Sequence, residues 1–129
     1  MIGSRPTVLV AEDDAELRDL ICQRLVSAGC SVESYPTGEQ LWRALVHRVD
    51  ILGVPPDLIV TDVRMPGRTG LDVVRQLRRY DRVTPVIVVT AFGDEHAASS
   101  AEQLGAHLIP KPFDLDQLLQ AAVSAGVIR

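Results

Sequence analysis

The sequence predicts an α/β fold, a doubly wound parallel sheet of five strands with helices on both faces. Two observations predict it. Short runs of β-branched and aliphatic residues do not alternate with polar residues, which indicates strands buried on both faces. Segments with the apolar spacing of a helix separate these runs, so strand and helix alternate five times along the chain. Because crossovers between parallel strands are right-handed, this order predicts helices on both faces of the sheet.

Three of the predicted strands are dense in aliphatic residues, at Thr7–Ala11, 58–61 and Val86–Thr90. Two weaker strands are expected at Ser31–Tyr35 and 106–109. The three dense runs are therefore expected to form the buried part of the sheet.

The first helix is predicted over 15–28. Asp13 or Asp14 can cap its start, and Gly29 supplies a left-handed stop. Its apolar positions form one stripe, made by Leu17, Leu20, Ile21, Leu25 and Ala28.

The second helix is predicted to open at Thr37, where Gln40 stands three residues on, as in a capping box. We expect four of its side chains to face inward, namely Leu41, Trp42, Ala44 and Leu45. Further helices are predicted over 71–80, 95–104 and 115–125, the last after an Asp114 cap.

The chain has 129 residues, the size of a single domain, and we expect one domain over residues 1–129. Stretches rich in Pro and Gly, at 53–56 and 66–70, fall between predicted elements and indicate loops. A formal net charge of -4 gives no electrostatic footprint for nucleic acid or an anionic membrane.

We expect a cytoplasmic protein. Residues 1–7 lack the basic and apolar regions of an export signal, and no apolar run approaches the roughly 20 residues of a membrane span. Cys22 and Cys30 are not spaced as metal ligands, so reduced structural thiols are expected. His47, His96 and His107 are scattered, which favours surface or packing roles.

Polar residues collect where the predicted strands end. Glu12, Asp13 and Asp14 follow the first strand, Asp62 the third, Thr90 ends the fourth and Lys111 follows the fifth. In an open α/β sheet, ligands bind beyond the carboxyl ends of the strands. We therefore expect these side chains to share one crevice.

This set of residues predicts phosphoryl chemistry at a divalent cation. Acids in one crevice repel each other, and oxygen ligands with room for water favour Mg²⁺. A carboxylate beside Mg²⁺ can act as a nucleophile toward a phosphoryl group, while a lysine and a hydroxyl stabilise the equatorial oxygens. Each residue alone also has an ordinary structural interpretation: a helix cap, a loop acid, a buried threonine or a solvated lysine.

The segments VLVAEDD, LIVTDVRMPGRTGLDVV, VIVVTAF and PKPF resemble the receiver domains of two-component response regulators. The resemblance covers nearly the whole chain, and the ordered set of motifs is specific where any one alone is weak. It implies a flavodoxin-like (βα)5 fold with strand order 2-1-3-4-5.

The resemblance implies that Asp62 is the phosphoacceptor and that Glu12 and Asp13 form the acidic metal pair. Asp14 then falls just past the site, in a capping role. The backbone carbonyl of Arg64 would be a further Mg²⁺ ligand, and Asp62 would share in binding the ion.

Further matches complete the implied site. Thr90 would hydrogen-bond a phosphoryl oxygen, and Lys111 would contact another. Pro112 follows a lysine that family members often hold through a cis peptide bond. Met65-Pro66 and Gly70 match the family's loop after the phosphoacceptor.

The chain departs from the family pattern in three places. Leu108 stands where the family commonly has an aromatic residue that moves on activation, which suggests that the usual coupling to the threonine is absent or altered, with Phe92 or Phe113 as substitutes. Arg64 and Phe92 flank the site, where they would slow the approach of hydrolytic water or simply point to solvent. The stretch 47–56 is longer than the family minimum.

Two apolar residues in this long stretch, Ile51 and Leu52, are expected to cover a helix end, with a partner contact as the alternative. The implied partner of the domain is a sensor histidine kinase or phosphotransfer protein, docking on the first helix near Leu17 and Leu20. The fourth helix, fifth strand and fifth helix would form the switched face and a possible homodimer contact.

The resemblance implies no enzyme in the ordinary sense, because the domain catalyses only its own phosphorylation and dephosphorylation. Two alternatives stay open from the residues. One is a degenerate receiver-like module that binds partners without phosphorylation. The other is a small Mg²⁺-dependent phosphohydrolase with an aspartate nucleophile.

Overall fold

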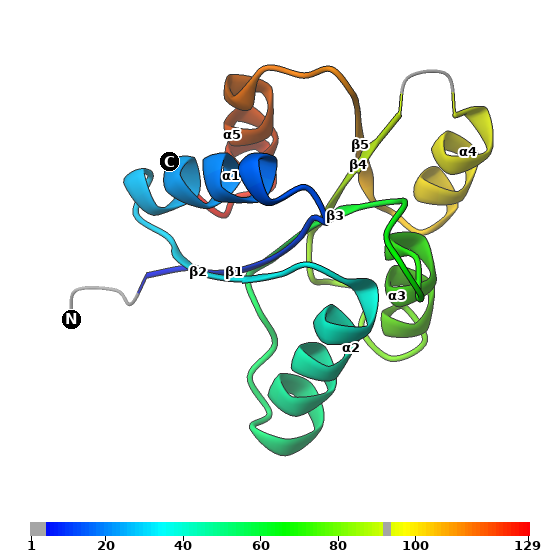
Figure 1. Ribbon diagram of the computed structural model, residues 1–129. Coiled ribbons are helices and arrows are strands. Elements are labelled where there is room, and N and C mark those ends of the chain that lie inside the picture. The colour runs from blue at the N-terminus through cyan, green and yellow to red at the C-terminus, as the bar shows by residue number, and fades with distance from the viewer. Residues whose placement is uncertain (1–4, 92–93) are drawn as a thin grey trace.

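The computed structural model describes residues 5–91 and 94–129, which form a five-stranded parallel sheet with helices on both faces (Figure 1). The strand order is β2-β1-β3-β4-β5. The strands are β1 (Thr7–Ala11), β2 (Ser31–Tyr35), β3 (Leu58–Asp62), β4 (Val86–Thr90) and β5 (His107–Pro110). The helices are α1 (Ala15–Ser27), α2 (Gly38–Val46), α3 (Gly70–Leu77), α4 (Glu95–Gln103) and α5 (Leu115–Ser124), with a π-helical turn, η1 (His47–Ile51), after α2. The predicted fold class and strand order are confirmed.

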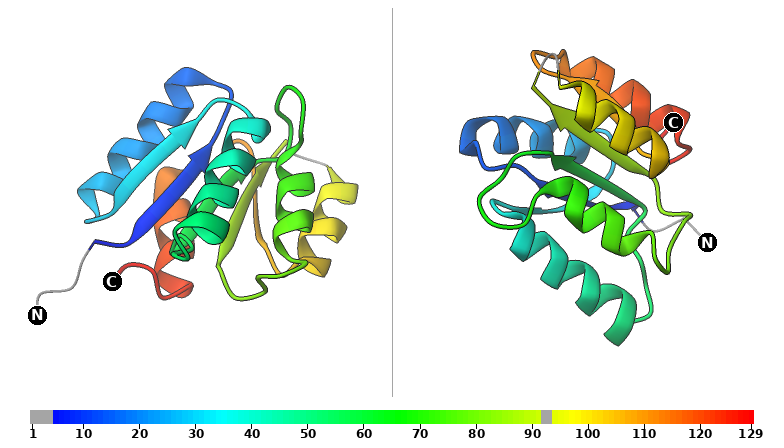
Figure 2. Two further views of the ribbon diagram at one scale, coloured as in Figure 1. Left: turned by 90° about the horizontal axis from the view of Figure 1, so that it is seen from below. Right: turned by 90° about the vertical axis from the view of Figure 1, so that its right-hand side faces the viewer.

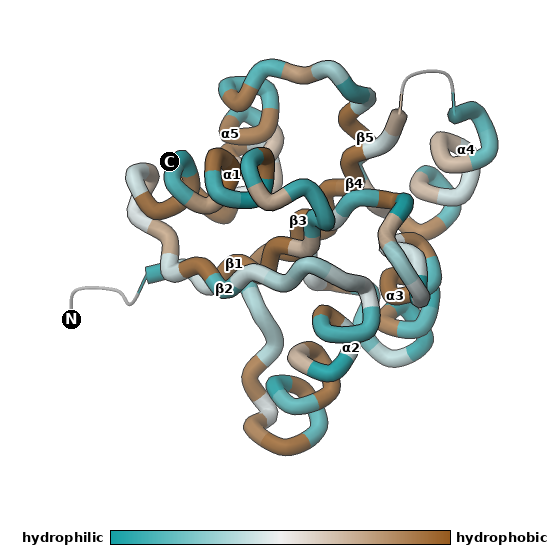
Figure 3. Tube along the Cα trace, viewed as in Figure 1, coloured by the Kyte–Doolittle hydropathy of each residue, from teal (hydrophilic) through white to brown (hydrophobic). Residues whose placement is uncertain are grey.

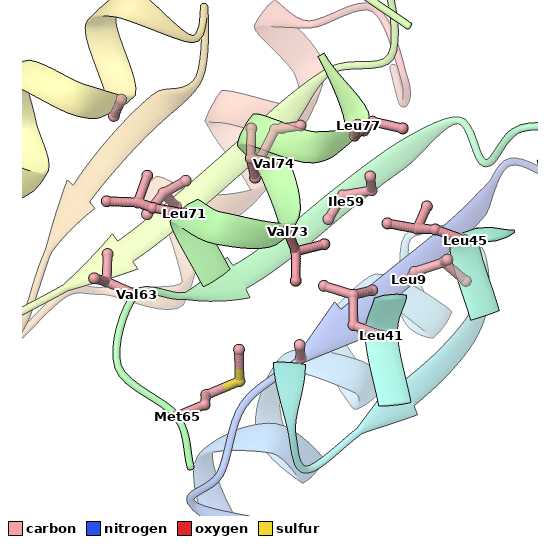
Figure 4. Close-up of a cluster of buried hydrophobic side chains, with 14 of the residues drawn as sticks. Leu9, Leu41, Leu45, Ile59, Val63, Met65, Leu71, Val73, Val74 and Leu77 are labelled. Carbon is pink, nitrogen blue, oxygen red and sulfur yellow. The ribbon is translucent and has the colours of Figure 1, made fainter. Parts of the chain in front are cut away.

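The sheet separates two hydrophobic cores. Helices α1 and α5 cover one face, and α2, α3 and α4 cover the other (Figures 1 and 2). In the first core, Ile21 and Leu25 of α1 meet Leu118 of α5 over alternate strand residues. Figure 4 shows the second core, in which Leu41 of α2 and Val73 of α3 close over the sheet.

The inner strands are buried throughout, as their unbroken aliphatic runs predict. Every residue of β3 and β4 is buried, whereas β2 and β5 lie at the edges and alternate with exposed positions. Figure 3 shows hydrophobic residues along the inner strands and polar residues on the outer faces of the helices. The buried inner strands hold the ends of β1, β3 and β4 in a fixed relation, which positions the polar residues that follow them.

The helix caps that the sequence predicts are present. Of the two candidates, Asp14 caps α1, and its side chain accepts from the amides of Glu16 and Leu17. Thr37 accepts from the amide of Gln40, and Asp114 forms a full capping box with Gln117. Gly29 ends α1 with φ +98°, a conformation that glycine adopts without a Cβ penalty.

Two members of the apolar stripe on α1 are exposed. Leu20 is 48% exposed and Ala28 is exposed, because α1 contacts the sheet along a narrower line that centres on Ile21 and Leu25. On α2, Trp42 is only half-buried, and its ring lies 5.4 Å from the guanidinium carbon of Arg68.

Residues 47–56 are not wholly a loop. Helix α2 continues into η1, where the amide of Leu52 donates to the carbonyl of His47. The expectation that Ile51 and Leu52 cover a helix end is wrong, since they are 69% and 56% exposed. Leu52 instead lines a hollow of about 580 Å³ with Tyr35 and Ala44.

Helix α3 ends earlier than its apolar pattern predicts, at Leu77, because the following turn forms bonds that compete with the helix. The carboxylate of Asp81 accepts from the amides of Val83 and Thr84 and from the Thr84 hydroxyl. In the part of the chain that the structure describes, no helix is both long and apolar enough to cross a membrane.

Candidate functional site

The sheet brings the predicted polar residues together at the carboxyl ends of its strands. Glu12 follows β1 directly, Asp62 is the last residue of β3, Thr90 is the last of β4 and Lys111 follows β5. The backbones of the last two are joined, because the amide of Lys111 donates to the carbonyl of Thr90 at 2.6 Å. The Lys111–Pro112 peptide bond is cis, as the resemblance implies.

Asp62 is held by one donor at each carboxylate oxygen. Its Oδ2 accepts from Lys111 Nζ at 2.7 Å, and its Oδ1 accepts from the backbone amide of Arg64 at 3.1 Å. The residue is 6% exposed. Charge-assisted bonds of this kind fix the orientation of a carboxylate, so Asp62 presents its remaining lone pairs in a defined direction.

Glu12, Asp13 and Asp62 form an acidic cluster. Each offers a carboxylate oxygen, and these atoms lie within 4.8 Å of one another. Glu12 and Asp62 are buried, whereas Asp13 is exposed at the rim. Like charges at this separation in a buried site are unfavourable unless a cation lies among them.

Glu12 shows this electrostatic cost most clearly. Its pKa is raised to about 7, first by burial and further by the charge of Asp62 and a bond with Asp13, against the opposing effects of the Asp14 amide and Lys111. Its Oε2 accepts from the Asp14 amide at 3.1 Å. Its Oε1 is buried and accepts no hydrogen bond within the described residues, although Lys111 Nζ lies 3.4 Å away, close enough for an ion pair.

Lys111 balances part of the acidic charge. Burial lowers its pKa, but the bond and charge of Asp62 and the charge of Glu12 outweigh burial, so the pKa of Lys111 is raised. It therefore stays protonated, but one ammonium between three carboxylates leaves the cluster negative.

This donor set fits a hard divalent cation. It consists of oxygen ligands with an accessible rim at Asp13, and the buried Oε1 of Glu12, which accepts no hydrogen bond within the described residues, is available as a ligand atom. Mg²⁺ is typically held by few carboxylates and keeps several waters. For Arg64, the structure shows its amide on Asp62, while the role of its carbonyl as a ligand stays a prediction.

Thr90 places a hydroxyl at the same strand edge. Its residue is 1% exposed, and its Oγ1 finds no hydrogen-bond partner across residues 5–91 and 94–129. An unpaired buried hydroxyl is costly, so its presence at the site suggests a partner that arrives with a ligand.

Gly70 has a steric role that sequence reasoning missed. A Cβ on Gly70 would lie 2.0 Å from the carbonyl oxygen of Asp62 and 2.7 Å from Thr61 Oγ1. The start of α3 can therefore pack directly behind Asp62 because Gly70 has no side chain. The motif match at Gly70 was the signal available, but it does not show which atoms are close.

The loop after β3 is tied to α4 by a pair that the sequence did not single out. Arg64 Nη2 lies 3.5 Å from Asp94, which also caps α4 through the amide of Ala97. The Arg64 side chain is 78% exposed, which agrees with the interpretation in which it points to solvent. Phe92, its predicted companion, lies outside the described residues.

Leu108 lies beside Thr90 on the side of the sheet that α2, α3 and α4 cover. It helps to line a hollow of about 270 Å³ with Thr90, Ala98 and Pro110. Phe113 packs on the opposite core, with α1 and α5, so it does not lie on the Leu108 face. The three histidines are exposed, as expected for surface residues.

Comparison with known proteins identifies the family. The family model described as the response regulator receiver domain matches residues 8–123. The DNA-binding transcriptional regulator NtrC of Escherichia coli K12 is 36% identical over 124 residues, which cover 93% of this chain and 25% of NtrC. The C4-dicarboxylate transport transcriptional regulatory protein DctD of Rhizobium meliloti is 35% identical over 122 residues, 94% of this chain and 25% of DctD. The chain thus spans about a quarter of the length of these relatives.

Solved structures agree. A response regulator receiver protein from Pseudomonas putida has a TM-score of 0.80 and 30% identity, and the match covers 95% of this chain and 99% of that one. The fold, the acidic cluster at the strand ends and the match over residues 8–123 lead to one conclusion. This chain belongs to the receiver domain family of two-component response regulators.

Proposed function

We propose that Asp62 accepts a phosphoryl group from a phosphohistidine donor and that residues 1–129 act as a single receiver domain. The observation that carries the proposal is the fixed carboxylate of Asp62, bonded to Lys111 Nζ at 2.7 Å beside two further acids. A buried carboxylate with a paired lysine and a cation site has the parts that phosphoryl transfer needs.

In this proposal, the Mg²⁺ ligands are the carboxylates of Glu12, Asp13 and Asp62 and the backbone carbonyl of Arg64. When bound, the ion would neutralise the acids and the charge on the phosphoryl oxygens. The Oε1 of Glu12, which accepts no hydrogen bond within the described residues, and the closeness of the three acids support this assignment.

The transfer is a substitution at phosphorus. An oxygen of Asp62 forms the new O–P bond while the P–N bond of the donor breaks, and the imidazole departs with the bonding electron pair. Lys111 stabilises negative charge on one phosphoryl oxygen, and the hydroxyl of Thr90 donates to another. Water later cleaves the acyl phosphate, so the domain catalyses only its own phosphorylation and dephosphorylation.

The same site would act as a switch. Phosphorylation gives the Thr90 hydroxyl an acceptor and so favours one state of the face formed by α4, β5 and α5. The hollow of about 270 Å³ beside Leu108 supports an altered form of this coupling, because space remains on that face next to Thr90.

The proposal also includes the setting of the domain. The partner is a sensor histidine kinase or a phosphotransfer protein in the cytoplasm, docking near α1, where Leu20 is 48% exposed. The α4-β5-α5 face is the candidate homodimer contact. The domain itself binds neither nucleic acid nor membrane in this proposal, and its net charge of -4 supports that.

Labelling with acetyl phosphate tests the proposal. The chain is incubated with acetyl phosphate with and without Mg²⁺, and the phosphoprotein is measured by intact mass. We expect one phosphoryl group per chain, dependent on Mg²⁺ and absent in Asp62→Asn. Asp19→Asn, at an exposed position on α1, is the matched control and should label like the parent.

Other outcomes would point to the alternatives. A correctly folded parent that takes no label would contradict the proposal and favour a partner-binding module. Steady release of phosphate from diverse phosphomonoesters would favour a phosphohydrolase. Label that persists in Asp62→Asn would move the acceptor to another residue.

A further inference from the structure

Four arginines gather at the end of α3, in the eight-residue stretch 75–82. They line a hollow of about 490 Å³ together with residues at the end of α4: Arg75, Arg78, Arg79, Arg82, Gln103, Leu104 and Gly105. Helices α3 and α4 lie side by side here (Figures 1 and 2). No carboxylate is among the lining residues, so the hollow is bordered by one sign of charge.

Arg78 forms the fixed part of this hollow. It is 8% exposed, its Nε donates to the carbonyl of Leu104 at 2.8 Å, and its Nη1 donates to the carbonyl of Asp81 at 3.2 Å. Among the described residues none accepts from its Nη2, and that atom is not sealed from solvent. Arg78 therefore joins α3 to α4 and still has donor capacity.

The other three guanidinium groups are more accessible. Arg75 is paired with Asp72 at 3.1 Å, and its side chain is 54% exposed. Arg79 and Arg82 are exposed and form no ion pair with any residue in the described ranges. The carboxylate of Asp81, the nearest acid in sequence, is occupied by the turn that it caps.

Two of the four guanidinium groups, those of Arg79 and Arg82, form no ion pair within the described residues, so the cationic charge of the hollow is only partly balanced. The pKa of Arg78 is lowered, mainly because the side chain is buried. The charge of Asp81 opposes this shift, and the charge of Arg82 adds to it. A bound anion would relieve this repulsion. The whole chain carries -4, so this cationic hollow is a local exception to the charge of the protein.

A purely structural role explains only part of the cluster. Cations near a helix end stabilise the free carbonyls of the last turn. Arg78 does this through the carbonyl of Leu104, the C-cap of α4, whereas Arg79 and Arg82 make no side-chain bond that the structure shows. Their clustering around one concave space therefore needs another explanation.

We propose that this hollow binds a small ligand with two or more phosphate groups. Guanidinium groups hold phosphate oxygens through paired hydrogen bonds, and several around one cavity suit a compact polyanion. A volume of about 490 Å³ falls within the range of ligand sites. A concave space closed by two helix ends fits such a ligand better than an extended acidic peptide.

The site is separate from the acids at the strand ends. Helix α3 starts at Gly70, behind Asp62, and its eight residues span about 12 Å. Arg78, Arg79 and Arg82 follow its last residue, Leu77, and Arg75 lies in its last turn. The proposed anion site therefore does not depend on phosphorylation of Asp62, and an experiment can contradict either proposal without contradicting the other.

The test is a titration of the full chain with inorganic tripolyphosphate in the absence of Mg²⁺, followed by ¹H–¹⁵N NMR and calorimetry. We expect saturable binding with shift changes at 75–82 and 103–105. In the double variant Arg79→Gln/Arg82→Gln the affinity should fall by at least about tenfold. The double variant Arg43→Gln/Arg129→Gln removes two exposed charges elsewhere and should bind like the parent.

The same titration can overturn the proposal. An equal loss of affinity in both double variants would show that net charge, and not this hollow, determines binding. Shift changes at Glu12, Asp62 and Lys111 in place of α3 would assign the anion to the other site. Tighter binding of an oligoglutamate peptide than of tripolyphosphate would indicate an acidic protein segment as the occupant, and an unsaturated response would exclude a built site.

Discussion

The two ends of α3 carry opposite kinds of charged cluster. At its start, Asp62 and Glu12 are buried, and Lys111 bonds the first at 2.7 Å and pairs with the second at 3.4 Å. Beyond its end, Arg79 and Arg82 are exposed and lie in the turns that follow Leu77. The first cluster is drawn from separate strands, whereas the second comes from one short stretch of chain.

This difference shows how position in the fold sets the energetics of a charge. Burial makes each missing partner costly at the acidic end, so a single substitution there has a large effect. Exposed charges at the other end are screened by water, and single substitutions there have small effects on stability. The predictions below test this contrast, from the largest expected effect to the smallest.

Replacing Lys111 by Met should have the largest effect on chemistry. Loss of one charged donor at a transferring group lowers the rate by about 10² to 10³-fold. Phosphorylation by acetyl phosphate measures this, and calorimetry should show tighter Mg²⁺ binding, because the competing ammonium is gone. Arg43→Met, on a side chain that is 77% exposed, should leave both unchanged. An unchanged labelling rate in Lys111→Met would contradict the role of Lys111 in phosphoryl transfer.

Gly70→Ala should have the largest effect on stability. The new Cβ would lie 2.0 Å from the carbonyl oxygen of Asp62, so the strand end or α3 must shift, at a cost of about 1–3 kcal/mol or more. Urea unfolding measures the cost, and labelling should fall with it. Gly105→Ala, where φ is +67° and no atom lies within 4 Å of the Cβ position, should destabilise without loss of labelling.

The buried acid Glu12 should make stability fall as the pH rises, when no divalent cation is present. Its folded pKa is about 7 against an ordinary 4.5, so the folded state binds the extra proton between these values. Stability relative to Glu12→Gln should therefore decline from pH 4.5 to 7 and then level off. Urea unfolding in EDTA across this range measures it. A flat difference would contradict the raised pKa.

Asp81, at the arginine end, should show the opposite dependence on pH. Burial raises its pKa, but bonds from Thr84 and Val83 and the charge of Arg78 outweigh burial and lower it below 3.8. Its contribution to stability is therefore present above pH 3.8 and lost as the pH falls through the folded pKa. Unfolding of Asp81→Ala and of the parent near pH 7 and pH 3 measures it. Asp19→Ala should show little change at either pH.

Arg64→Ala should have the smallest effect, although Arg64 lies at the acidic end. Its side chain is 78% exposed and its contact with Asp94 is long, at 3.5 Å. We expect less than about 0.5 kcal/mol in stability and a lifetime of the phosphorylated form within about threefold of the parent. A tenfold faster dephosphorylation would show that the side chain shields the site and that exposure does not set its effect.

The sequence by itself determined the fold class and the polar residues that meet at the strand ends. Unbroken aliphatic runs mark strands buried on both faces, and caps such as Asp14 and Asp114 depend on neighbours within three residues. Once the strands are placed, the residues that follow them must meet at one edge of the sheet. The match of residues 8–123 to the receiver family agrees with the inferred fold class.

The tertiary structure decided which atoms touch and which faces remain open. That Gly70 abuts the Asp62 carbonyl, or that Leu20 points to solvent, depends on helix positions that no local pattern encodes. The arginines of 75–82 are visible in the sequence, but the hollow forms where they meet the end of α4, to which Arg78 is bonded. Local rules act over about one helical turn, whereas these contacts join residues far apart along the chain, so packing of the whole domain sets them.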